Sequence, residues 1–90
     1  MTRVAQQIAA IRRAIQRIAP LLKVEAGRGS VYGWVYIQPS PRRDLTIDER
    51  QALEGLGIVA GHTGAVLPPE RRKETANRIQ ESDHALAAHR

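Results

Sequence analysis

The stretch "TRVAQQIAAIRRAIQRIAPLL", residues 2–22, decides the fold of the N-terminal part because it repeats with a helical period and ends at a proline. Five β-branched side chains recur at steps of four, three, four and three residues. At about 100° per residue they fall within an arc of about 80°, which predicts one narrow apolar ridge on an amphipathic helix. The ridge consists of Val4, Ile8, Ile11, Ile15 and Ile18. Since proline disrupts a helix one turn back, we expect the helix to end near Ile18, ahead of Pro20.

Two partners are compatible with this ridge. Its spacing is that of a coiled-coil seam, which favours a homodimer through the N-terminal helix, although fewer than three heptads precede Pro20. Packing against the protein's own sheet is the alternative. The sequence leaves both open.

The next segment predicts an antiparallel hairpin. Residues 21–26 and 30–38 alternate in polarity and flank "AGRG", residues 26–29, where glycines favour a turn. Alternation in the second run places Val31, Val35 and Ile37 on one face and Tyr32, Trp34 and Tyr36 on the other. These three rings are all the aromatic side chains of the protein. They form either part of the core or an exposed platform on which bases or a protein partner stack.

The remaining sequence predicts two further helices. Thr46 and Glu49 form a T-x-x-E capping box, and Gly57 favours a helix end. Residues 58–69, "IVAGHTGAVLPP", predict a short strand or hairpin. Pro69 suits the first position of the last helix. Residues 70–90 carry few apolar side chains, so we expect a peripheral C-terminal helix that is partly frayed.

Together these elements predict one small α+β domain over residues 1–90. It has an N-terminal amphipathic helix, an antiparallel hairpin or three-stranded sheet, and two further helices. Such a chain is long enough for one modest core.

Charge is distributed unevenly along the chain. The net charge is +5, and residues 1–24 contain five basic and no acidic side chains. From Glu25 onward, nine basic residues balance nine acidic ones. A basic element on an otherwise neutral domain is typical of proteins that meet an anionic partner. The alternative is an ordinary solvated helix face.

The sequence contains no arrangement typical of an enzyme. Cysteine is absent, which excludes disulfides, thiolate catalysis and cysteine-based zinc sites. His84 and His89 are five residues apart and share a helical face poorly, and His62 lies in a glycine-flanked turn. We therefore expect no catalytic residues, no metal site and no cofactor. No apolar run approaches the ~18 residues that span a bilayer, so we expect a cytoplasmic protein without membrane contact.

Two classes of function fit these features. The first is a small nucleic-acid-binding or regulatory module in which cations contact phosphate and aromatic rings stack or support them. The second is a protein-binding adaptor or inhibitor, such as a phage- or mobile-element-encoded antagonist of a host protein complex, which offers the same cations to an acidic surface. In both, the candidate residues are Arg3, Arg12, Arg13, Arg17, Lys23, Arg28, Arg42, Arg43, Tyr32, Trp34 and Tyr36.

Overall fold

The computed structural model describes the backbone of residues 2–88 and the side chains of residues 2–82. Its elements, in chain order, are α1 (Arg3–Ile18), β1 (Leu22–Ala26), the 3₁₀ turn η1 (Gly29–Val31), β2 (Val35–Pro39), α2 (Ile47–Gly55), β3 (Ala65–Leu67) and α3 (Pro69–Ala88). The chain is a small α+β domain with an N-terminal helix and a three-stranded antiparallel sheet, as the sequence predicts.

Helix α1 begins and ends where the sequence indicates. The Thr2 side chain accepts a hydrogen bond from the Ala5 amide at 3.1 Å, which satisfies one of the free donors of the first turn. The helix ends at Ile18, and Ala19 closes it just before Pro20. A proline two residues past the last helical residue is therefore accommodated without a kink.

The centre of the apolar ridge lies in the protein's own core. Ile11 and Ile15 are fully buried and Ile8 is 6% exposed, whereas Val4 is only partly buried and Ile18 is 46% exposed. The intramolecular alternative thus accounts for the three central side chains. Self-association through the ridge stays a prediction, and in this fold only Val4 and Ile18 remain accessible to a second copy.

The sheet has the order β1-β2-β3, with β2 in the centre. Val24 of β1 pairs with Ile37 of β2, which in turn pairs with Ala65 of β3. These three side chains are buried on the same face of the sheet. Both outer strands, β1 and β3, are edges.

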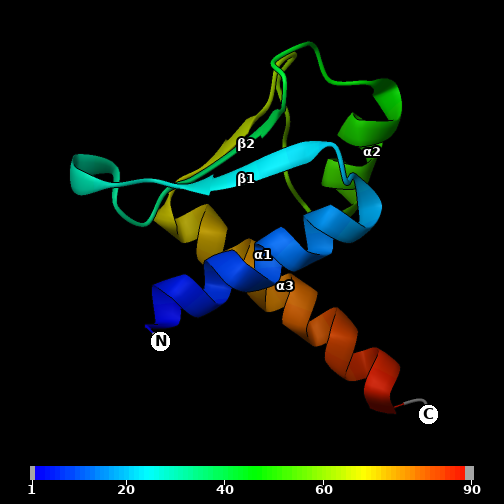
Figure 1. Cartoon of the computed structure of the whole chain (residues 1–90). Coiled ribbons are helices and arrows are strands. Elements are labelled where there is room, and N and C mark those ends of the chain that lie inside the picture. Colours follow the sequence, from blue (N-terminus) through cyan, green and yellow to red (C-terminus); the bar gives the residue numbers. More distant parts are fainter. Residues whose placement is uncertain (1, 89–90) are drawn as a thin grey trace.

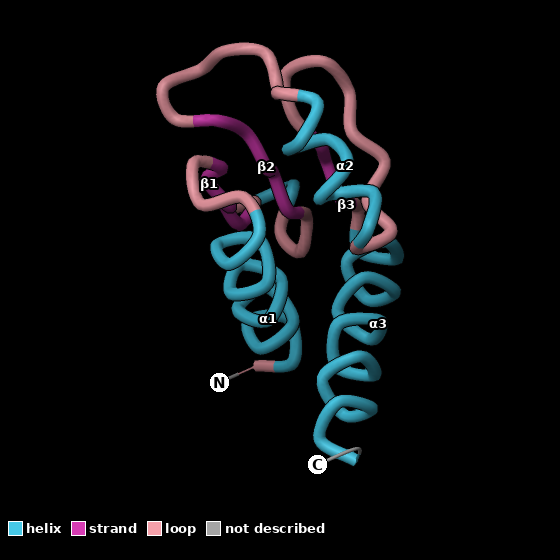
Figure 2. The backbone as a smooth tube through the Cα atoms, turned by 90° about the vertical axis from the view of Figure 1, so that its right-hand side faces the viewer, coloured by secondary structure: helices cyan, strands magenta, loops and turns pink. Residues whose placement is uncertain are grey.

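The helices cover one face of this sheet. Figure 1 shows α1 and α3 crossing beneath the strands, and the view in Figure 2 shows the same two-layer arrangement. Leu53 of α2 and Ile58 after it are buried in the same core, so α2 packs against one end of that core. The opposite face of the sheet carries the exposed or partly buried members of each strand, which are Lys23, Glu25, Tyr36, Gln38 and Val66.

The second strand begins later than the sequence predicts. The sequence predicts a strand over residues 30–38, but residues 29–31 form η1 and β2 starts only at Val35. Gly33 has a φ of +90°, a conformation that L side chains rarely adopt and that interrupts regular alternation. Val31, Tyr32 and Trp34 therefore belong to the connection between β1 and β2. The expected row of three rings on one strand is wrong for Tyr32 and Trp34, since only Tyr36 lies on β2.

Helix α2 confirms its capping signals. The Thr46 side chain accepts from the Glu49 amide at 3.1 Å, and the Glu49 carboxylate accepts from the Thr46 amide at 2.9 Å. The helix closes through Leu56, and Gly57 follows with a φ of +80°. Both ends are thus specified by local sequence.

Helix α3 begins at Pro69 and is docked by a buried arginine. Arg72 is 3% exposed, and its Nε donates to the Gln7 side-chain oxygen at 2.9 Å. Its Nη1 donates to the Gly33 carbonyl at 2.6 Å. One guanidinium therefore joins α3, α1 and the β1–β2 connection. The expected fraying of the chain end stays a prediction, since residues 89–90 and the side chains from Asp83 onward lie outside the described part.

Replacement of Arg72 by methionine is expected to lower the free energy of unfolding by about 2–4 kcal/mol. It leaves a buried amide oxygen and a buried carbonyl without donors, each costing about 1–3 kcal/mol, offset in part by the lost desolvation of the charge. Urea unfolding followed by circular dichroism measures this. Arg71→Met, at an exposed neighbour, is the matched control and should change stability by less than about 0.5 kcal/mol. Equal stability of the two variants would contradict the structural role of Arg72.

Candidate functional site

The fold distributes the predicted site residues over separate surfaces. Arg3, Arg13 and Arg17 are exposed on the side of α1 that points away from the sheet. Tyr36 lies on the open sheet face, on the other side of the molecule. Arg42 and Arg43 lie in the connection between β2 and α2. One continuous surface that contains all eleven residues does not exist, so the predicted site has to be divided.

The outward cations of α1 have no carboxylate partner. Among the described side chains, ion pairs form only between Lys23 and Glu25 and between Arg43 and Glu49. Arg3, Arg13 and Arg17 are in neither pair. Arg13 and Arg17 are four residues apart, which corresponds to about 6 Å along the helix axis. The result is a row of uncompensated positive charge, which we call the α1 basic face.

Carboxamide side chains border this face where α1 and α3 diverge. Arg3, Gln6 and Gln7 of α1 and Asn77 and Gln80 of α3 line a notch of about 350 Å³. These side chains offer both donors and acceptors beside a guanidinium. Carboxamide and guanidinium groups are able to hydrogen-bond phosphate oxygens and base edges.

Arg43 has a structural role. Its Nη1 and Nη2 donate to the two carboxylate oxygens of Glu49 at 2.7 and 2.9 Å, and Nη1 also donates to the Asp44 carbonyl at 2.9 Å. Because Glu49 is also the second member of the α2 capping box, whose N-cap is Thr46, this fork fixes the helix start to the preceding loop. Arg43 is therefore paired within the chain, whereas Arg3, Arg13 and Arg17 are not; its contact with an anionic partner stays a prediction.

The same contacts shift the ionisation of Glu49. The hydrogen bonds from Arg43, with smaller contributions from the Thr46 amide and the charge of Arg43, lower the pKa of the Glu49 carboxyl to about 2, against the opposing effect of burial. They also raise the pKa of Arg43. Glu49 is thus ionised over the whole ordinary pH range.

Arg12 and Lys23 differ from the α1 basic face. Arg12 lies on the other flank of α1 and donates from Nε and Nη2 to the Val24 carbonyl at 3.4 and 3.1 Å. Its charge remains uncompensated because a carbonyl is neutral. Lys23 is 3.2 Å from Glu25 in an exposed pair, which contributes little to stability and opens easily. Arg28, in the β1–β2 connection, is exposed.

The aromatic residues also separate. Tyr36 and Trp34 are partly buried, whereas Tyr32 is 62% exposed in the β1–β2 connection. In the pairing register Tyr36 lies between Glu25 and Val66, on the face away from the helices. All three rings are therefore outside the main core, and Tyr36 lies on the sheet face away from the helices.

Sequence reasoning missed Arg72 and Gln7. A signal for Arg72 was present: it precedes the buried Ala76 and Ile79 by four and seven residues, so it lies on the same helical stripe. A cation on an apolar stripe indicates a buried hydrogen-bonded group. Of the histidines, His62 is exposed, while the side chains of His84 and His89 lie outside the described part.

Comparison with protein families, with curated proteins and with solved structures finds no match to this chain. Among residues 2–88, no helix combines the length and apolarity needed to cross a bilayer.

Glu49→Gln is expected to reduce the loss of unfolding free energy that the wild type shows as the pH falls. Because the folded pKa is lowered, the stabilisation is present above the unfolded value of about 4.5 and is lost as the pH falls toward about 2. The difference in unfolding free energy between wild type and variant should therefore be constant above pH 5 and shrink toward pH 2. Urea titrations at several pH values measure it. The exposed Glu54→Gln is the control, and a pH-independent difference for Glu49→Gln would contradict the assignment.

Proposed function

We propose that this chain is a non-enzymatic nucleic-acid-binding or regulatory module that contacts phosphates through the α1 basic face. The observation that carries the proposal is the exposure of Arg3, Arg13 and Arg17 without a carboxylate partner among the described side chains. Uncompensated cations in a row attract a polyanion and release its counterions on binding.

The neighbouring groups support the same partner. Gln6, Asn77 and Gln80 lie beside Arg3 in the notch between α1 and α3. Carboxamides hydrogen-bond both phosphate oxygens and base edges, so this notch suits contacts beyond pure charge attraction. Arg43 is paired with Glu49, and Tyr36 lies on the sheet face away from the helices, so we leave both out of the proposed contact surface.

The salt dependence of the affinity distinguishes phosphate contacts from nonspecific binding of another kind. Three phosphate contacts predict a slope of about −2.7 in a plot of log affinity against log salt, or roughly a 40-fold loss between 50 and 200 mM salt. Fluorescence anisotropy with a labelled duplex DNA of about 20 base pairs measures the slope. Absence of binding, or binding that ignores salt, would refute the proposal.

A charge-neutralised variant tests the assigned surface. In Arg13→Gln/Arg17→Gln, two phosphate contacts are lost, so the salt slope should fall in magnitude by about 1.8. Arg42→Gln/Arg71→Gln removes the same charge from exposed positions outside the α1 basic face and serves as the matched control. If both double variants weaken binding equally, net charge rather than the α1 basic face determines the interaction.

A further inference from the structure

Strand β1 is an edge with backbone groups that point away from the sheet. The Gly27 amide donates to the Trp34 carbonyl and the Ser40 amide to the Leu21 carbonyl, which flank the paired strands on both sides. Since hydrogen bonding alternates along an antiparallel pair, Lys23 and Glu25 bond to β2. The amides of Val24 and Ala26 therefore point outward. No hydrogen bond in the described part of the chain engages either amide.

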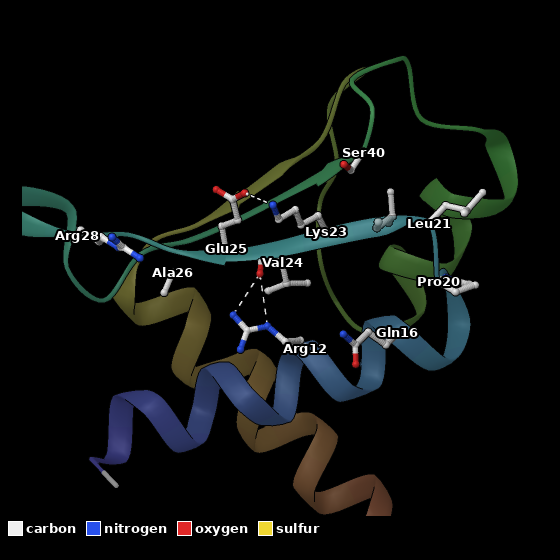
Figure 3. A pocket seen from close by; sticks show the side chains of 11 residues that line it. Arg12, Gln16, Pro20, Leu21, Lys23, Val24, Glu25, Ala26, Arg28 and Ser40 are labelled. Atoms are coloured by element: carbon white, nitrogen blue, oxygen red, sulfur yellow. Dashed lines mark hydrogen bonds and ion pairs between the residues drawn. The ribbon is translucent and has the colours of Figure 1, made fainter.

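A groove runs along this edge. It has a volume of about 900 Å³ and lies between β1 and the flank of α1 that carries Arg12 and Gln16. Figure 3 shows the Arg12 guanidinium under the strand at the Val24 carbonyl, with Arg28 at one end of the groove and Pro20 and Leu21 at the other. Leu21 is 66% exposed, an apolar side chain at the groove end.

The groove is positively charged. Arg12, Lys23 and Arg28 line it together with a single acid, Glu25, which is already paired with Lys23. Arg12 is partly buried and bonded only to a neutral carbonyl. A carboxylate placed beside it would compensate a charge that the chain itself leaves uncompensated.

A second copy of the chain fits this edge poorly. A twofold axis at Val24 would pair Lys23 of each copy with Glu25 of the other, which is favourable. The same axis would also bring together two Arg12 guanidinium groups, because both donate to the Val24 carbonyls at the shared edge. Two adjacent cations without an acid between them disfavour the dimer.

We infer that the outer edge of β1 and the adjoining groove bind an extended acidic segment of another protein by strand addition. The segment extends the sheet through the Val24 and Ala26 amides. Its alternate side chains face either the open side, beside Lys23 and Glu25, or the groove, where its carboxylates meet Arg12. This site is distinct from the α1 basic face, which lies on the opposite flank of the same helix.

Nuclear magnetic resonance tests the inference on the whole chain. The probe is a synthetic peptide of about seven residues in which glutamate alternates with threonine. On saturation, hydrogen exchange should slow at the Val24 and Ala26 amides, whereas Lys23 and Glu25 are protected already in the free protein. The same peptide with lysine in place of glutamate should not bind. No binding of the acidic peptide, or equal binding of both, would overturn the inference.

Two variants separate the backbone and charge contributions. Ala26→Pro removes an outward amide and leaves the pairing with β2 intact, and Arg12→Gln removes the charge. Each should raise the Kd for the acidic peptide by at least about tenfold. Arg13→Gln/Arg17→Gln is the matched control and should bind the peptide as wild type does. Unchanged affinity in Ala26→Pro and Arg12→Gln would overturn the inference, and so would an Arg12→Gln protein that dimerises, because Arg12 would then only protect the edge.

Discussion

A buried guanidinium determines how the three main parts of this domain fit together. Arg72 of α3 donates to Gln7 of α1 and to the carbonyl of Gly33 in the β1–β2 connection. Neither partner is charged, so the cation is desolvated without a counter-charge. Its burial depends on these hydrogen bonds. The φ of +90° at Gly33 favours glycine there, and an added Cβ would also lie 2.7 Å from Nη1 of Arg72. The contact adds to the burial of Ile11 and Ile15 in holding α1 against the rest of the domain.

Arginines in this chain have three different roles, which depend on the groups that each side chain contacts. Arg72 and Arg43 have structural roles. The Arg72 guanidinium donates to two neutral oxygens, and the Arg43 guanidinium donates to the Glu49 carboxylate. Arg12 compensates an outward carbonyl on the sheet edge and keeps its charge available there. The cations of the α1 basic face have no partner within the described chain. The net charge of +5 therefore does not say how much positive charge each surface carries. The argument for an anionic partner rests on the local charge of the α1 basic face.

The sequence predicted what local chemistry and periodicity specify. The Ile ridge, the end of α1 before Pro20, the capping box at Thr46 and the start of α3 at Pro69 all depend on residues close in the chain, and the structure confirms them. The start of β2 was wrong because Gly33, held by a residue 39 positions away, interrupts an otherwise regular alternation. The site was predicted as one set for the same reason: sequence spacing does not tell which face of a layered fold receives each side chain. Pairings such as Arg43 with Glu49 depend on how a loop turns back onto a helix.

The most direct test of the account is the response of individual arginine side chains to a polyanion. Nuclear magnetic resonance resolves the Nε–H groups of arginines during a titration with duplex DNA. We expect the signals of Arg3, Arg13 and Arg17 to shift together as DNA is added, while those of Arg43 and Arg72 stay unchanged. Shifts spread evenly over all exposed arginines, or confined to residues outside the α1 basic face, would contradict it.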